Sequence, residues 1–532
     1  MNTGPDLEPH SMPSSSNNTK VARALLLPQR RLGHILVMAA VFAAAFAARL
    51  YKIDQPPLDR QPTRQYRSLL IARGYYFRTL DAAPEWEKHV AARNLSRLAL
   101  HEPPITEYLV SLTYRVVHGE HFWVSRSFCS LFWVIGGVFC YLIARKIASP
   151  DAALLCTVFY LFLPYGIKAS RTFQPDPLMI MVMLASLYAI VCYAIQPSLR
   201  ALLVAAIVSA LAIVVKPPMS FFPIFGAFIA FGTLRRNILK TVLSRRFILF
   251  AFIALLPCIL YGVYGMFVAD FLRRPAENSI FPQLLLQSRY WRGWSYTLSF
   301  TVGYRALCGA LLGLILCRNA FARALLIGLW VGYVVFGLVF TCGIRTHAYY
   351  HLILIPIIGL SLTPLADVVL GALRQSPRLW LPRIATWVVL LVTVWRPLRA
   401  DFEARAEADF DETIRLREEV GEVVGHSAET IIFDRHFGSI LKYHGKVSGD
   451  WWPSPSDLRR WALQGRPVKS DEDRLDEMIE KQSPEFFIIV AASYGKTRKK
   501  LSEMLAKRYR TLTDTDNYII FDLKRPVVPS EE

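Results

Sequence analysis

The sequence predicts an α-helical polytopic membrane protein of about eleven spans that ends in a small α/β domain. The chain is 53% hydrophobic, and its apolar residues gather in long runs. A run of about 17 to 25 such residues is long enough to cross a bilayer. Near residue 397 the character changes, and charged residues begin to alternate with short apolar stretches. We therefore expect a membrane region followed by a soluble region.

The basic residues predict the orientation of the spans. Clusters such as "PQRRLGH" and "RRNILKTVLSRR" fall on one side of the predicted spans, and such clusters collect in cytoplasmic loops. With an odd number of spans, the C-terminal segment lies on the other, extracytoplasmic side. The predicted spans cover residues 33–50, 123–144, 151–166, 177–196, 200–215, 218–234, 247–268, 299–317, 323–341, 349–371 and 380–396.

Three segments follow from this division. Residues 1–32 are basic and rich in Ser, Asn and Pro, as is typical of a disordered cytoplasmic tail. Residues 33–396 form the transmembrane region, in which the outer loop 51–122 is long, amphipathic and rich in aromatic residues, which predicts helices in the membrane interface. Residues 397–532 form the soluble domain, where "ETIIFD", "EFFIIVA" and "NYIIFDL" predict buried strands.

The charge distribution limits the classes of partner. The net charge of +20 is carried before residue 397, because residues 397–532 hold 22 basic and 26 acidic residues. A basic surplus in short membrane loops indicates topology and contact with membrane lipids rather than nucleic-acid binding. The chain also has no P-loop and no GxGxxG motif, so nothing indicates a nucleotide.

Two aspartates at the outer side are the first candidates for chemistry. Asp59 lies in "LDRQPTRQYR" among several arginines, and Asp176 lies in "SRTFQPDPLM" at the mouth of a span. Ionisable groups at membrane depth are costly and are usually functional or paired. Asp59 is either an ion-pair partner at a helix end or a catalytic base. Asp176 is either a helix N-cap, with Pro177 as the first helical residue, or a substrate ligand.

A third outer motif is "RTHAYYHLILIP". It places a guanidinium, an imidazole and two phenols at the outer interface, from Arg345, His347, Tyr349 and Tyr350. The alternative interpretation is an aromatic belt with a basic anchor. Together with Arg171, these groups suit an anionic phosphate.

Four motifs in this order resemble the polytopic glycosyltransferases that use lipid-linked sugars: "LDRQPTRQYRSLLIAR", "EPPITEYLVSLTYRV", "SRTFQPDPLM" and "HAYYHLILIP". This GT-C group includes the protein O-mannosyltransferases and the lipid A aminoarabinose transferases, and the resemblance covers roughly residues 33–370. The chain departs from the first family where Arg60, rather than a second acid, follows Asp59. It departs from the second where "HEPP" stands in place of Glu-Lys-Pro.

The resemblance implies a bacterial inner-membrane enzyme with an extracytoplasmic catalytic face. Such an enzyme moves a hexose or pentose from a polyprenyl-phosphate donor to a hydroxyl or phosphate of a lipid, glycan or protein, with inversion at the anomeric carbon. Asp59 and Asp176 map onto the acidic positions of the family, and we expect Asp59 to be the base. The expected donor phosphate-binding residues are Arg64, Arg171, Arg345, His347, Tyr349 and Tyr350.

The sequence leaves open whether the protein binds a divalent metal ion. His101, Glu102 and His347 offer nitrogen and oxygen ligands, but their spacing does not define a site. His101 and Glu102 are equally candidates for contact with the acceptor. No other cofactor is indicated.

Two other classes of function remain as alternatives. A transporter or flippase of a lipid-linked anion could use the same outer arginines. However, carriers place charge near the bilayer midplane and have two matching halves with broken spans, whereas the acidic groups here gather at one face. A membrane scaffold would leave the outer clusters of acidic and basic residues unexplained.

Overall fold

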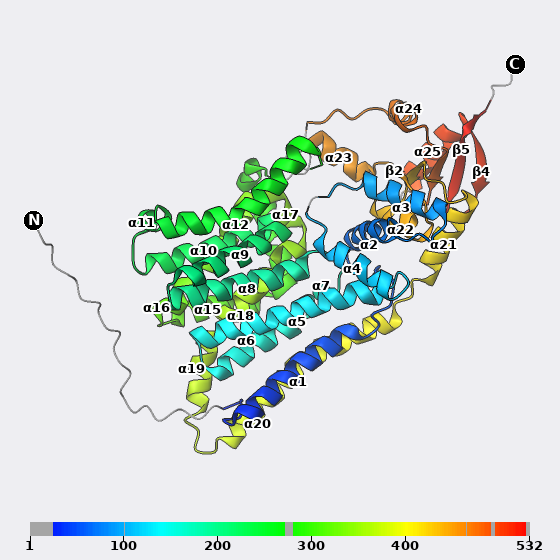
Figure 1. Cartoon of the computed structure of the whole chain (residues 1–532). Coiled ribbons are helices and arrows are strands. Elements are labelled where there is room, and N and C mark those ends of the chain that lie inside the picture. The colour runs from blue at the N-terminus through cyan, green and yellow to red at the C-terminus, as the bar shows by residue number, and fades with distance from the viewer. Residues whose placement is uncertain (1–24, 101, 272–279, 464, 491–494, 528–532) are drawn as a thin grey trace, which may run out of the picture.

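The protein is a long helical bundle that carries a small mixed sheet at one end (Figure 1). The computed structural model describes residues 25–100, 102–271, 280–463, 465–490 and 495–527. The N-terminal tail, residues 1–24, therefore lies outside the described residues.

The helices of the bundle follow the apolar runs of the sequence. Their bounds are α1 (Arg31–Leu50), α5 (Phe122–Ile147), α6 (Pro150–Phe162), α7 (Pro164–Ser170), α8 (Asp176–Ile195), α9 (Leu199–Val215), α10 (Pro217–Thr233), α11 (Ile238–Val242), α12 (Arg245–Val263), η1 (Tyr264–Val268), η2 (Pro282–Leu286), α14 (Ser288–Val302), α15 (Tyr304–Leu316), α16 (Ala320–Val339), α17 (Thr341–Thr346), η3 (Ala348–His351), α18 (Leu354–Ser361), α19 (Thr363–Leu373) and α20 (Trp380–Glu407).

Seven helical stretches among the described residues are long and apolar enough to cross a membrane, or nine if each bent pair is one span. Two shorter apolar helices, α9 and α10, accompany them. The bent pairs are α6 with α7, at 57°, and α14 with α15, at 90°. Pro164 starts α7, and Gly303, whose φ of 77° suits glycine, joins α14 to α15. The predicted span 299–317 crosses this second bend, so the count of eleven stays a prediction.

The long loop after α1 folds into three helices: α2 (Pro62–Phe77), α3 (Glu85–Arg97) and α4 (Ile105–Val116). The helix α2 contacts α3, α4 and the small helix α22 of the C-terminal domain. Most of the α2 side chains are buried as a result. This places α2 between the membrane bundle and the C-terminal domain, next to the N-terminal ends of α5 and α8 (Figure 1).

The C-terminal domain is a five-stranded mixed sheet with strand order β2-β1-β3-β5-β4. Strand β1 pairs in parallel with β2 and with the central strand β3, and β5 runs antiparallel to β3 and β4. Its elements are α21 (Asp411–Val423), β1 (Thr430–Phe433), η4 (Arg435–Gly438), α22 (Ser439–His444), β2 (Gly449–Trp451), α23 (Pro455–Leu463), α24 (Asp471–Gln482), β3 (Phe486–Ile489), α25 (Gly495–Ala506), β4 (Tyr509–Asp514) and β5 (Ile519–Pro526).

The three apolar stretches that predicted strands form β1, β3 and β5. Their side chains, such as Ile431, Phe487 and Phe521, are buried in one apolar core. The helix α20 continues through residue 397 to Glu407, with Pro397 inside it. The domain is thus joined to the bundle by a continuous helix rather than by a flexible linker.

Candidate active site

The helix ends nearest the C-terminal domain bring distant polar residues together. Asp176 is the first residue of α8, and Lys216 immediately precedes α10. The helix α9 runs back between them, so the two N-terminal ends meet at the same end of the bundle. Arg64, in the first turn of α2, and Tyr349, in η3, approach from the other side. We call Arg64, Glu102, Asp176, Lys216 and Tyr349 the Asp176 cluster.

Asp176 is completely buried and faces two cations. Its Oδ1 accepts a hydrogen bond from Lys216 Nζ at 2.7 Å, and its Oδ2 lies 3.6 Å from Arg64 Nη2. Oδ2 accepts no hydrogen bond from any described residue. The helix α8 begins at Asp176 itself, so Pro175 occupies the N-cap position. The N-cap alternative is therefore wrong for this residue, because its carboxylate turns toward Lys216 instead.

Tyr349 lies under both cations of the cluster. The Arg64 guanidinium is 4.2 Å from the centre of the Tyr349 ring, and Lys216 Nζ is 5.0 Å from it. Such contacts attract a cation to the negative face of the ring. Arg64 also lies 3.9 Å from Glu102. A small cavity opens beside Arg64 and is lined by Glu102, Pro175 and neighbouring residues of α2 and α4.

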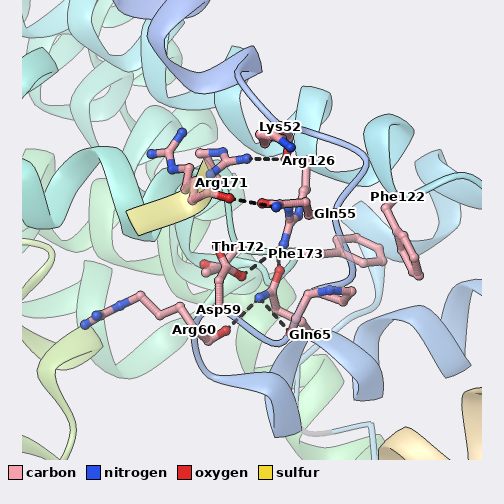
Figure 2. A network of polar contacts seen from close by, with 12 residues as sticks. Lys52, Gln55, Asp59, Arg60, Gln65, Phe122, Arg126, Arg171, Thr172 and Phe173 are labelled. Carbon is pink, nitrogen blue, oxygen red and sulfur yellow. Dashed lines mark hydrogen bonds and ion pairs between the residues drawn. The ribbon is translucent and has the colours of Figure 1, made fainter. Parts of the chain in front are cut away.

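A second group of residues surrounds Asp59, in the turn between α1 and α2 (Figure 2). Asp59 Oδ1 accepts a hydrogen bond from Arg126 Nη2 at 3.0 Å, and the Asp59 side chain is 31% exposed whereas that of Arg126 is 2% exposed. Arg171 donates to the carbonyls of Tyr51 and Lys52, at 2.9 and 3.0 Å. We call Asp59, Arg126, Arg171 and the turn they hold the Asp59 network.

The turn is fixed from the side of α2 as well. Gln65 donates to the carbonyl of Arg60 at 2.6 Å and accepts from the backbone N–H of Phe173 at 3.0 Å (Figure 2). Residues on α2 and on the α7–α8 connection therefore hold Asp59 in place. Arg60 turns away from Asp59 and lies 4.5 Å from the centre of the Tyr165 ring.

The remaining candidates from the sequence lie in three places. Tyr350 is next to Tyr349, with ring centres 4.9 Å apart. His347 is exposed, and its ring centre is 5.2 Å from that of Tyr349. Arg345 lines a separate hollow together with Arg289 and Arg292. His101 lies outside the described residues.

The structure thus groups Arg64, Glu102, Asp176, Tyr349 and Tyr350, but it places Arg171 with Asp59. Arg171 is five residues from Asp176 in the sequence, yet its guanidinium points to the α1–α2 turn. Arg345 is likewise not in contact with the Asp176 cluster among the described contacts. The predicted phosphate-binding residues are therefore not one contiguous set.

Two central residues were absent from the sequence-based candidates, Lys216 and Arg126. Lys216 stands alone between two apolar runs in "VVKPPM", and Arg126 stands near the start of the second predicted span in "VSRSF". An isolated cation at the end of an apolar run is the signal that would have found both, because burying it requires a partner.

The described residues do not contain a group of three or more His, Cys, Asp or Glu side chains arranged to hold a metal. Glu102 and Asp176 both face Arg64, which already supplies positive charge between them. A metal ion does not fit this pair without displacing Arg64. We therefore derive no chemical step through a metal.

Comparisons with known proteins agree with this architecture. Residues 101–261 match the family model described as dolichyl-phosphate-mannose-protein mannosyltransferase. The structure is similar to that of ArnT from Cupriavidus metallidurans bound to undecaprenyl phosphate, at 12% identity and a TM-score of 0.55, covering 92% of this chain and 98% of ArnT. The apo form of the same protein gives 13% identity and a TM-score of 0.57, with the same coverage. The chain has the GT-C glycosyltransferase fold.

A third similar structure is the archaeal oligosaccharyltransferase AglB from Archaeoglobus fulgidus, in complex with an inhibitory peptide and a dolichol-phosphate. It is 10% identical, with a TM-score of 0.50, and the match covers 89% of this chain and 72% of AglB. No curated protein sequence matches the chain. The predicted helical membrane-type fold with a small C-terminal α/β domain and the resemblance to the GT-C group are confirmed. The count of eleven spans and the extracytoplasmic side of the domain stay predictions.

Proposed function

We propose that this GT-C protein is an integral-membrane glycosyltransferase that moves a sugar from a polyprenyl-phosphate-linked donor to a hydroxyl or phosphate of an extracytoplasmic acceptor. The observation that carries the proposal is the buried Asp176 cluster, in which Arg64 and Lys216 share one carboxylate at the outer helix ends. The fold match to a protein bound to undecaprenyl phosphate supports the class of donor. The sugar is a hexose or a pentose, and the acceptor is a lipid, a glycan or a protein.

Arg64 and Lys216 are the proposed contacts for the donor phosphate. Arg64 Nη2 lies 3.6 Å from Asp176 and 3.9 Å from Glu102. Charge-assisted hydrogen bonds are usually about 2.7–2.9 Å long, so Arg64 can pair with a phosphate without breaking a short ion pair. Asp176 is sealed from solvent and orients both cations. Stabilising the phosphate as it leaves is the largest contribution expected of such preorganised charges.

Asp59 is the proposed general base. Its side chain is 31% exposed, whereas Asp176 is fully buried, so an acceptor hydroxyl can approach Asp59 more easily. Arg126 Nη2 donates a hydrogen bond to Asp59 Oδ1 and so orients the carboxylate, while Oδ2 is not part of this bond. In the proposed step, the acceptor oxygen attacks the anomeric carbon, and its proton passes to Asp59. The bond from the anomeric carbon to the phosphate oxygen breaks, and the polyprenyl phosphate leaves with the electron pair. This single displacement inverts the anomeric centre, as the resemblance implies.

The comparisons favour this transferase over a transporter of lipid-linked anions. The proposed setting is a bacterial inner membrane, with the two acidic groups and the C-terminal domain on the extracytoplasmic side. The C-terminal domain contacts α2 through α22, so it is placed to influence acceptor entry.

The test uses purified protein in vesicles, a panel of undecaprenyl-phosphate-linked sugars, and membrane extracts as acceptors. Replacing Asp59 by Asn removes the base and keeps the shape, which should reduce turnover by about a hundredfold to ten-thousandfold. Asp54→Asn is the matched control, since Asp54 is an exposed aspartate of the same turn. Binding of undecaprenyl phosphate is measured separately. Normal turnover in Asp59→Asn, together with an inactive Asp176→Asn that still binds undecaprenyl phosphate, would reverse the two roles.

A further inference from the structure

A cavity of about 440 Å³ lies at the end of the bundle opposite the Asp176 cluster. Asp176 begins α8, and residues 190–197 at the other end of α8 form part of the cavity wall. At a rise of 1.5 Å per residue, the 20 residues of α8 separate the two places by roughly 30 Å. In Figure 1 this end is marked by α11, whereas the sheet lies at the other end. We call this cavity the distal cavity.

The rim of the distal cavity is basic. Lys146, Arg235, Arg236 and Arg246 all line it, and all four residues are exposed. None of the four forms an ion pair with another described residue. No acidic residue is among the lining residues, every one of which belongs to the described part of the chain. The rim therefore carries an uncompensated positive charge that favours an anion.

The interior of the distal cavity is apolar and aromatic. Tyr193 stacks on Phe228 with ring centres 5.7 Å apart, and Phe231 stacks on Phe321 at 4.5 Å, and all four rings line the cavity. A free inorganic anion would gain nothing from these rings, whereas a molecule with an apolar part would bury surface against them. The combination of a basic rim with an aromatic interior fits an amphiphile.

The surroundings of the cavity also fit a membrane boundary. Leu234 and, on α11, Ile238 and Leu239 expose 45%, 64% and 67% of their surface. Apolar side chains next to basic ones are typical of the layer where lipid headgroups meet the acyl chains. The first residues of α12 and α16 also line the cavity, so the positive ends of two helix dipoles add to the attraction for a phosphate.

We propose that the distal cavity binds an anionic phospholipid. The phosphate pairs with the basic rim, and the upper part of the acyl chains packs on the aromatic interior. Basic pockets between transmembrane helices are suited to acidic lipid headgroups. This inference does not depend on the proposed sugar transfer, because the distal cavity shares no residue with the Asp176 cluster or with the Asp59 network.

The experiment measures lipid retention by the full chain in phosphatidylcholine nanodiscs doped with phosphatidylglycerol. Native mass spectrometry counts the phosphatidylglycerol molecules that stay bound after release from the disc. The site variant combines R235A, R236A and R246A. Because it removes several charge-assisted contacts, it should weaken retention of phosphatidylglycerol by about a hundredfold. The charge-matched control combines R245A, R318A and R323A, which are nearby basic residues that do not line the cavity.

A second variant tests the cavity without changing its charge. Ala194→Trp should fill the interior, since Ala194 lines it, and should also abolish retention of phosphatidylglycerol. Equal losses in the site variant and the charge-matched control would mean a diffuse surface attraction and would overturn the proposal. Retention of phosphatidylcholine equal to that of phosphatidylglycerol would also overturn the proposal. Displacement of phosphatidylglycerol by millimolar inorganic phosphate would overturn it as well, because it would indicate a site for the free anion.

Discussion

The ion pair between Asp176 and Lys216 allows the sharpest quantitative prediction. Its two side chains are 0% and 6% exposed, and Lys216 Nζ lies 2.7 Å from Asp176 Oδ1. Removing one partner of a buried pair leaves an uncompensated charge, which typically costs about 3–5 kcal/mol. Asp176→Asn should therefore lower the free energy of unfolding by about this amount, because Lys216 and Arg64 would then repel each other.

A double variant also removes the charge of Lys216, which the single variant leaves without its partner. The double variant Asp176→Asn/Lys216→Met leaves no unpaired lysine, so it should recover much of the lost stability, with a coupling energy of about 2–3 kcal/mol. Stability is measured by chemical or thermal unfolding of the protein in detergent. Binding of undecaprenyl phosphate should nevertheless stay weak in the double variant, since Lys216 is one of the proposed phosphate contacts.

The chain contains a second ion pair that serves as a matched control for this double-mutant cycle. Arg399 and Glu403 form an ion pair with the same N···O distance of 2.7 Å, but their side chains are 66% and 54% exposed. Exposed pairs contribute about 0–1 kcal/mol, because water screens the charges. A coupling energy for Asp176 and Lys216 no larger than that for Arg399 and Glu403 would refute the argument that burial makes this pair important.

Three further predictions concern other parts of the chain. Asp151 accepts hydrogen bonds from the backbone N–H groups of residues 25, 26 and 27, so Asp151→Asn should release this segment. Limited proteolysis should then cleave the segment faster, and an unchanged cleavage rate would mean that Asp151 does not hold it in place. Glu429 pairs with Arg97 at 2.5 Å, so Glu429→Gln should raise hydrogen exchange in α3, whereas the exposed Glu503→Gln should not. Burial lowers the pKa of His444 to about 3, with nearby cations adding to the effect, so the unfolded domain binds the proton more strongly. Unfolding free energy should then fall by up to about 1.4 kcal/mol per pH unit below pH 6.5, and His444→Gln should reduce this slope.

The interface between α2 and α22 explains why acidification should act there first. His444 Nε2 and the Tyr66 hydroxyl are 2.8 Å apart, and Tyr66 is completely buried. Burial also lowers the pKa of His436, which lies 3.0 Å from the hydroxyl of Thr63. Both histidines belong to the C-terminal domain, and both partners belong to α2 or its start. Protonation would therefore weaken the contact between the C-terminal domain and α2.

The sequence by itself determined the class of fold, and it predicted the end of the bundle where we propose that the chemistry lies. Hydropathy and short apolar stretches are local properties of the sequence. The apolar helices and the strands β1, β3 and β5 could therefore be predicted without tertiary information. The motifs around Asp59, Asp176 and Tyr349 could also be assigned to one side of the membrane, because the charged loops alternate along the chain.

Only the tertiary structure decided which of these residues are partners. Asp176 and Lys216 are 40 residues apart, and they meet because α8 and α9 have similar lengths and return the chain to the same end of the bundle. Arg171, in contrast, is close to Asp176 in sequence, yet its long side chain reaches the carbonyls of the α1–α2 turn. Residue spacing carries no information on the direction of such a side chain. That direction depends on which buried carbonyl or carboxylate lacks a partner, and this is settled only when the helices pack.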